Sequence, residues 1–176
     1  AITRSQITLE NPPEGELEAF LEVYRKMGGQ YKGNSGKLLV NGEHVQKPVE
    51  LLETAVYPGF PTDLQSPVMA VLATVKGRSC IRENVFEDRY KAAQQLVKMG
   101  ADIRVQGKEA VIHGGKELHG AIVTAWELRG GAALILGALC VKGVTVLDGY
   151  SYVQRGYEHI CQDLNTLGAA VKRMQE

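Results

Sequence analysis

Apolar side chains recur every three or four residues in three stretches of the chain, and each stretch predicts one amphipathic helix. The apolar positions are Leu17, Phe20, Leu21, Tyr24 and Met27 in the first, Tyr90, Ala93, Leu96 and Val97 in the second, and Tyr157, Ile160, Cys161, Leu164 and Leu167 in the third. This spacing predicts one buried face on each helix. A glycine follows each stretch, at Gly28, Gly100 and Gly168, and predicts a left-handed residue that ends the helix.

Two further helices are predicted before a repeated Val-Lys-Gly tripeptide, with Gly77 and Gly143 as their stops. The first opens with Thr62 and Gln65 at the spacing of a capping box. The second is apolar nearly all round, which is typical of a helix buried among other elements.

Short runs rich in β-branched residues lie between the helices and predict strands bounded by Gly and Asn turns. The runs are 7–10, 38–40, 53–57, 80–83, 102–106, 110–113, 121–125 and 144–147. Helices that alternate with such strands must cover a sheet, so the sequence predicts an α/β layered domain.

The same pattern returns about every seventy residues. Equivalent places at 26–29, 98–101 and 166–169 are 72 and then 68 residues apart. We therefore predict a single domain, 1–176, built from pseudo-symmetric βαβαββ units. The predicted units are 1–78, 79–143 and a partial third, 144–176.

Charge and cysteine content exclude several classes of function. The chain carries 20 basic and 20 acidic side chains, so no long-range field attracts nucleic acid or an anionic membrane. The longest apolar run, 132–141, is about half the length of a bilayer span, and residues 1–4 do not resemble a secretory signal. Cys80, Cys140 and Cys161 sit in apolar or periodic runs, as core residues of a reduced cytoplasmic protein do. The four histidines lack metal-ligand spacing.

Five motifs together resemble the enolpyruvyl transferase family in order and spacing. They are Tyr57–Gln65, Glu83–Arg89, Met99–Ile103, Glu127–Arg129 and Arg155–Glu158. The resemblance is greater to the branch that acts on UDP-N-acetylglucosamine than to the branch that acts on shikimate 3-phosphate. It implies an enzyme of two domains, each an inside-out α/β barrel of three units, and it implies that this chain is most of the C-terminal domain.

The resemblance also implies a reaction. The enolpyruvyl group of phosphoenolpyruvate would move to the 3-hydroxyl of UDP-N-acetylglucosamine, the first committed step of peptidoglycan synthesis, without a metal or organic cofactor. The chemistry needs a base, an acid, and cations that face phosphate and carboxylate. In the family the N-terminal domain carries a mobile loop with a reactive cysteine, so we expect this chain alone to be inactive.

By the same resemblance, the catalytic and substrate-binding residues would be Thr62, Asp63, Val85, Glu87, Arg89, Glu127, Arg129 and Arg155. Asp63 would be the base, and Arg155 would contact the phosphate of phosphoenolpyruvate. Two arginines, at 89 and 129, would shape the cationic surroundings, and the glutamates at 87 and 127 would orient them. The residues at 62 and 85 would contact the nucleotide sugar.

The repeat spacing offers a separate expectation for the charged residues. Asp63 and Arg129 are 66 residues apart, and Glu87 and Arg155 are 68 apart, so equivalent positions in successive units carry opposite charges. Such residues can converge on a shared rim that holds an anionic substrate. The residues alone leave simpler interpretations open: a carboxylate near a helix dipole at 63, a helix cap at Thr62, and surface ion pairs elsewhere.

One position departs from the family pattern, which usually has Ala-Thr-Asp-Leu-Arg where this chain has Ala-Trp-Glu-Leu-Arg at 125–129. Glu127 keeps the charge on a side chain one methylene longer. This change and the absent loop support an alternative, a noncatalytic binding or regulatory module that keeps the fold.

Overall fold

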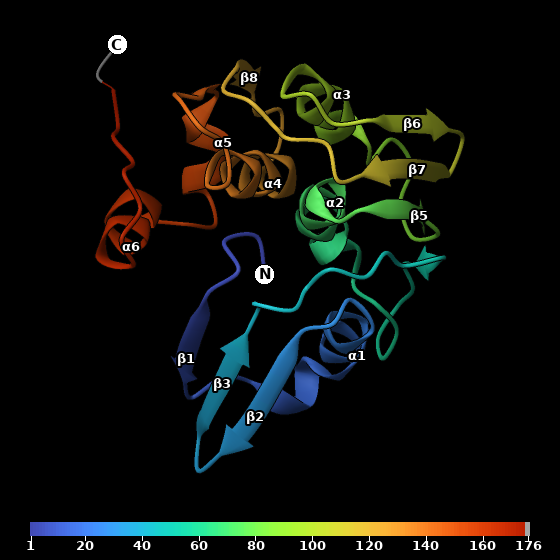
Figure 1. The fold of residues 1–176 in the computed structure, drawn as a ribbon, viewed down its shortest axis with the longest axis vertical. Coiled ribbons are helices and arrows are strands. Elements are labelled where there is room, and N and C mark those ends of the chain that lie inside the picture. The colour runs from blue at the N-terminus through green and yellow to red at the C-terminus, as the bar shows by residue number, and fades with distance from the viewer. Residues whose placement is uncertain (175–176) are drawn as a thin grey trace.

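The computed structural model describes residues 1–174, whose helices and strands are drawn in Figure 1. The helices are α1 (Glu18–Lys26), α2 (Gln65–Thr74), α3 (Lys91–Lys98), α4 (Leu128–Ala138), α5 (Tyr150–Gln154) and α6 (Ile160–Thr166), with 3-10 turns η1 (Glu14–Glu16) and η2 (Thr62–Leu64). The strands are β1 (Gln6–Glu10), β2 (Gln30–Asn34), β3 (Lys37–Asn41), β4 (Leu52–Glu53), β5 (Gly77–Arg82), β6 (Ile103–Gln106), β7 (Glu109–Gly114), β8 (Ile122–Thr124) and β9 (Val146–Asp148).

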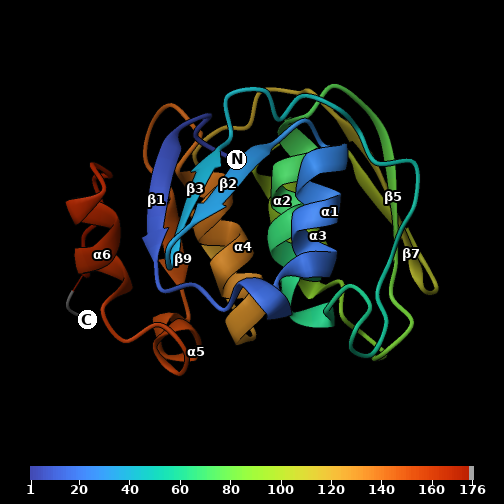
Figure 2. The ribbon, with the colours of Figure 1, turned by 90° about the horizontal axis from the view of Figure 1, so that it is seen from below.

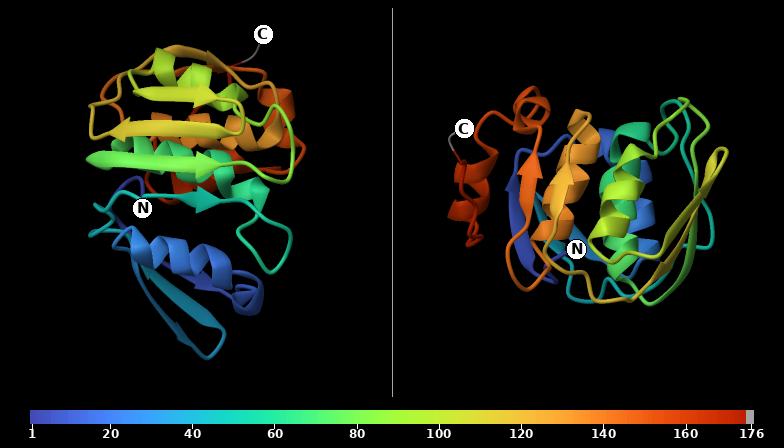
Figure 3. Two further views of the ribbon diagram at one scale, coloured as in Figure 1. Left: turned by 90° about the vertical axis from the view of Figure 1, so that its right-hand side faces the viewer. Right: turned by 90° about the horizontal axis from the view of Figure 1, so that it is seen from above.

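The strands form three separate sheets. One is antiparallel with the order β1-β3-β2, and a second has the order β4-β5-β7-β6, with β4 parallel to β5. The third is the parallel pair β8-β9. In Figure 2 helices α1 to α4 lie between the first two sheets, and the left view of Figure 3 faces the four-stranded one. The predicted α/β architecture is confirmed, with helices α1 to α4 on the inside.

The order of elements repeats along the chain. The series β1, α1, β2, β3, β4, α2 is followed by β5, α3, β6, β7, β8, α4 in the same order. This is the order that the predicted units 1–78 and 79–143 require, although their boundaries stay a prediction. None of the helices among the described residues is long and apolar enough to cross a membrane.

Helices α2 and α4 pack against each other at the centre of the domain. Met69 and Leu72 on α2 and Leu134 on α4 are at most 1% exposed. The small residues of α4 let α3 approach closely, since a Cβ at Gly137 would lie 3.2 Å from Leu96. The expectation that this apolar helix is buried is therefore confirmed, and it explains why the helix is rich in Gly and Ala.

The glycine stops after the three amphipathic stretches are confirmed. Gly28, Gly100 and Gly168 have φ angles of 97°, 97° and 95°, in the left-handed region that glycine adopts at low cost. The other two stops are wrong. Helix α2 ends at Thr74, before Gly77, because Val75 is already extended, and α4 ends at Ala138, before Gly143.

Other differences concern polar or weakly packed segments. Strand β2 was not predicted because Gln30–Asn34 is polar and mostly exposed, yet it pairs with β3 through a tight turn. The predicted strand 53–57 is reduced to β4. The third amphipathic helix begins only at Ile160, and its predicted buried face is wrong, since no residue of α6 is buried and Leu167 is 70% exposed.

Two smaller expectations about burial are also wrong. Val97 on α3 is 45% exposed. Of the three cysteines, only Cys80 is buried, whereas Cys140 and Cys161 are half-buried; all three are free. Burial raises the pKa of the thiols of Cys80 and Cys140, which makes them weak nucleophiles.

A comparison of two glycines tests the packing around the helix ends. Gly28 and Gly100 share a φ of 97°, but a Cβ at Gly28 would overlap the backbone oxygen of His44, whereas one at Gly100 would lie 3.1 Å from the movable ring of His119. Urea unfolding should show a loss of about 1–2 kcal/mol for Gly100→Ala. Gly28→Ala should lose about 2–5 kcal/mol, because backbone must also shift. Equal losses would show that the contact with His44 does not constrain the position.

Candidate functional site

A cavity of about 560 Å³ opens beside the turn η2. Its walls come from four parts of the chain: residues 15–22 around the start of α1, the loop 55–63, the turn 85–89 and the start of α4. Five of the predicted site residues line it: Thr62, Asp63, Val85, Arg89 and Arg129. Its volume falls within the range of small-molecule sites.

An ion pair spans the cavity between two units of the chain. Arg129 donates from Nε to Oδ1 of Asp63 at 2.8 Å. The hydrogen bond to Asp63 raises the pKa of the Arg129 guanidinium, which therefore stays charged. The repeat spacing predicted that these two positions converge, and the structure brings them together.

A second ion pair lies at the edge of the same cavity. Arg89 approaches Glu127 with 3.5 Å between Nη1 and Oε2, and its guanidinium lies 4.6 Å from the centre of the Phe86 ring. The other oxygen of Glu127 accepts the N–H of Gly130 at 2.9 Å and so caps α4. The longer side chain at position 127 can thus cap a helix and hold an arginine at once.

Two predicted residues lie apart from this group. Glu87 and Arg155 are exposed and do not line the cavity, and their side chains form no ion pair within residues 1–174. The structure therefore shows no ion pair between these two positions, and their role in the site stays a prediction. Of the charged residues predicted for the site, three line the cavity: Asp63, Arg89 and Arg129.

A buried carboxylate that the sequence did not single out lies behind the cavity. Glu83 follows strand β5 and is 1% exposed. Its Oε1 accepts hydrogen bonds from the Thr54 hydroxyl at 2.8 Å, the Val85 N–H at 2.8 Å and the Phe86 N–H at 3.0 Å. No spacing rule could have found this set, because the threonines lie 29 and 21 residues before Glu83.

The second oxygen of Glu83 fixes the opposite wall. Its Oε2 accepts the Thr62 hydroxyl at 2.8 Å. The predicted capping box of Thr62 and Gln65 is therefore wrong: residues 62–64 form the turn η2, and α2 has no side-chain cap. Burial alone would raise the pKa of Glu83, but its hydrogen bonds together hold that pKa below its ordinary value.

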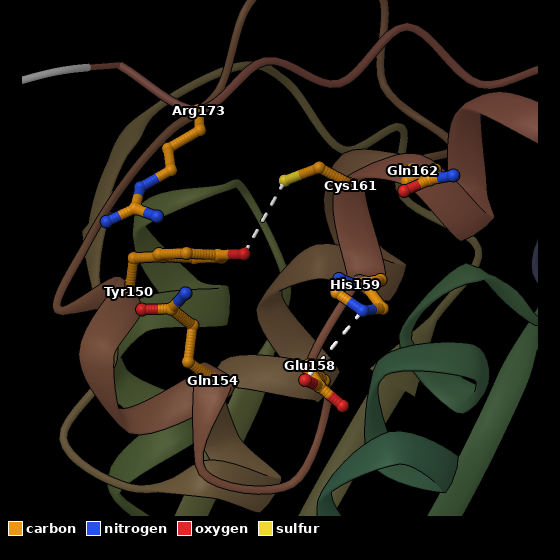
Figure 4. A pocket seen from close by; sticks show the side chains of 7 residues that line it. All are labelled: Tyr150, Gln154, Glu158, His159, Cys161, Gln162 and Arg173. Atoms are coloured by element: carbon orange, nitrogen blue, oxygen red, sulfur yellow. Dashed lines mark hydrogen bonds and ion pairs between the residues drawn. The ribbon is translucent and has the colours of Figure 1, made fainter.

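A second cavity, of about 430 Å³, lies near the C-terminal end and is drawn in Figure 4. Its walls include Tyr150, Cys161 and Arg173, with the guanidinium of Arg173 5.3 Å from the centre of the Tyr150 ring. None of the predicted site residues lines it. Across residues 1–174, no three His, Cys, Asp or Glu side chains gather as metal ligands would.

Comparisons with known proteins identify relatives of the chain. The family described as EPSP synthase (3-phosphoshikimate 1-carboxyvinyltransferase) matches residues 1–164. A UDP-N-acetylglucosamine 1-carboxyvinyltransferase from Desulfofundulus thermocisternus is 42% identical over 98% of this chain and 71% of its own length. One from Clostridium tetani, numbered 2, is 41% identical over 99% of this chain. The chain spans 42% of that relative's length.

Solved structures agree with these relatives. The enolpyruvyl transferase NikO from Streptomyces tendae matches 96% of this chain and 40% of its own, with a TM-score of 0.85 and 26% identity. An EPSP synthase from Acinetobacter baumannii has a TM-score of 0.71 over 99% of this chain and 41% of its own, at 19% identity, and supports the fold alone.

The pH dependence of stability tests the buried carboxylate. Because the folded-state pKa of Glu83 lies below its ordinary value of 4.5, its stabilisation is complete above that value and is lost as the pH falls through the folded-state pKa. Between about pH 5 and 2, the free energy of unfolding should fall more steeply for the unmodified chain than for Glu83→Gln. Parallel curves in urea unfolding would contradict an ionised, hydrogen-bonded Glu83.

Proposed function

Because the chain belongs to the EPSP synthase family of enolpyruvyl transferases, we propose that it is a catalytic part of an enzyme that transfers the enolpyruvyl group of phosphoenolpyruvate to the 3-hydroxyl of UDP-N-acetylglucosamine. The observation that carries the proposal is the Asp63–Arg129 pair, which places a carboxylate and a guanidinium in one cavity beside Arg89 and Thr62. In a bacterial cell the product would commit the sugar nucleotide to peptidoglycan, and we propose that the enzyme works in the cytoplasm.

The cavity separates the tasks that the chemistry requires. A base must take the proton of the sugar hydroxyl as its oxygen bonds to the central carbon of the enol, and Asp63 is our candidate. Arg89 and Arg129 lie where they could face the phosphate and carboxylate of phosphoenolpyruvate. When phosphate leaves, the same cations would stabilise its charge. An anionic substrate would also compete with Asp63 for Arg129, and so free the carboxylate to act as a base.

The remaining groups of the reaction must come from elsewhere in a longer protein. The acid that protonates the vinyl carbon is expected from a second domain that closes over this one. The exposed rim supports closure: Val56, Tyr57 and Phe86 line the cavity and are 76%, 77% and 53% exposed. Glu87 and Arg155, which lie outside the cavity here, could act only if closure brought them toward the substrates.

A noncatalytic binding module is the alternative. It was favoured by the longer side chain at Glu127, but that residue caps α4 and approaches Arg89, so the change leaves the charge arrangement in place. The alternative therefore differs from the proposed enzyme in one expectation: a longer protein that contains this chain would bind the substrates but would not convert them.

Binding of the nucleotide sugar by this chain is the first test. UDP-N-acetylglucosamine should shift the amide NMR signals of Thr62, Asp63 and Val85, and shikimate 3-phosphate should not, because it lacks the nucleotide. Phosphate release from phosphoenolpyruvate should stay at background when both substrates are mixed with this chain. Shifts confined to other residues, or equal shifts with both sugars, would contradict the proposal.

Turnover in a longer protein that contains this chain is the second test. Asp63→Ala should lower kcat by about 10²–10⁴-fold with an unchanged melting temperature, because a positioned base is removed. Asp163→Ala, an exposed carboxylate on α6, is the matched control and should keep normal turnover. Full activity of Asp63→Ala would remove it from the mechanism.

A further inference from the structure

The hydrogen bonds around Glu83 have a fixed direction. An ionised carboxylate has no proton to give, so each of its four partners must donate. The Thr62 hydroxyl has one proton, and it points to Oε2 of Glu83. The Thr54 hydroxyl likewise donates to Glu83 and accepts the N–H of Asn84 at 2.9 Å.

This direction determines how Thr62 can meet a ligand. Its hydroxyl is half-buried and lines the cavity, and its only proton is already used. The lone pairs that remain can only accept a hydrogen bond. A ligand group beside Thr62 must therefore carry an N–H or O–H.

The charge of Glu83 adds a second constraint. Its hydrogen-bond partners are hydroxyls and amides rather than cations, so its negative charge is not neutralised by a bonded partner. Such a charge repels anions in a poorly hydrated site. The two guanidiniums of the cavity belong to Arg89 and Arg129. An anionic substrate should place its charged groups toward them and its neutral, donor-bearing part toward Thr62.

We propose that Glu83 is a positioning residue that orients the Thr62 hydroxyl as a hydrogen-bond acceptor for a neutral N–H or O–H group of the substrate. The same carboxylate holds the N–H groups of Val85 and Phe86, so it fixes two walls of the cavity relative to each other. The inference rests on the proposed function, because a nucleotide sugar offers hydroxyls and an amide N–H on the part that carries no charge.

A double-mutant cycle tests the proposal through binding. In Glu83→Gln the amide can donate to Thr62, whose proton then turns toward the cavity and opposes a ligand donor. Glu83→Gln and Thr62→Val should each weaken binding of UDP-N-acetylglucosamine about tenfold, and the double variant should be no weaker than either. Thr62→Ser keeps the hydroxyl and should bind within about threefold of the unmodified chain. Unchanged binding in either single variant, or losses that multiply, would overturn the proposal.

A measurement without ligand separates this proposal from the proposed function. A hydroxyl proton held by a buried carboxylate exchanges slowly, and the NMR signal of the Thr62 hydroxyl should be visible in the free chain and displaced or lost in Glu83→Gln. If that signal does not respond to Glu83→Gln, Glu83 does not orient Thr62 and the proposal fails, whatever the chain binds. If it responds but the unmodified chain binds no nucleotide sugar, the proposed function fails and the role of Glu83 toward that ligand fails with it.

Should Glu83→Gln fail to fold, the threonine variants still decide the matter. Thr62→Val is expected to lose binding and Thr62→Ser to keep it, with binding compared at a temperature where both are folded, because Thr62→Val removes a donor from Glu83 and should melt lower. Equal binding by these two variants would overturn the proposal, because the hydroxyl would then have no part in recognition.

Discussion

A carboxylate can be buried only where hydrogen bonds replace the water it gives up, and this requirement shapes the candidate site. Glu83 meets it with four donors drawn from three segments of the chain: Thr54, Thr62 and the N–H groups of the turn after β5. To lose any one donor would leave buried charge unsatisfied. The loop before α2 and the turn at 85–86 are therefore held by one group, and the cavity between them keeps its shape.

The charged residues of the cavity act within that frame. The Asp63–Arg129 pair joins η2 to the first turn of α4, yet its side chains are 58% and 35% exposed, so it contributes little to stability. Its importance lies in its position, because it places a carboxylate and a guanidinium at one opening. A charged group of a ligand could there replace either partner of the ion pair. The hydrogen bonds of Glu83 thus fix the walls of the cavity, whereas the exposed Asp63–Arg129 pair can rearrange.

The sequence could predict those parts of the fold that repeat or that depend on near neighbours. Helical periodicity predicted α1 and α3, and the glycines after them predicted their ends. The spacing of the units predicted that Asp63 and Arg129 lie together. It could not predict Glu83, whose partners come together only when β4, β5 and η2 are in place. Strand β2 could not be predicted for a related reason. Its residues are polar and show no strand pattern of their own, and they form a strand because they pair with β3. Helix α6 shows the opposite case. Its apolar spacing predicted a buried face, but such a face is buried only where another element packs on it.

Under the proposed function, the arrangement of charge would let one cavity hold two anionic substrates. A uniformly cationic pocket would bind phosphates strongly but would not distinguish the neutral part of a ligand from its charged part. Here the guanidiniums of Arg89 and Arg129 share a cavity with Thr62, behind which lies the uncompensated charge of Glu83. Electrostatic energy then depends on ligand orientation, because reversing the ligand would move its phosphates toward a buried anion. A hydroxyl held near Thr62 would lie beside the next residue, Asp63, and proton removal would then require that carboxylate to come within hydrogen-bond reach of it.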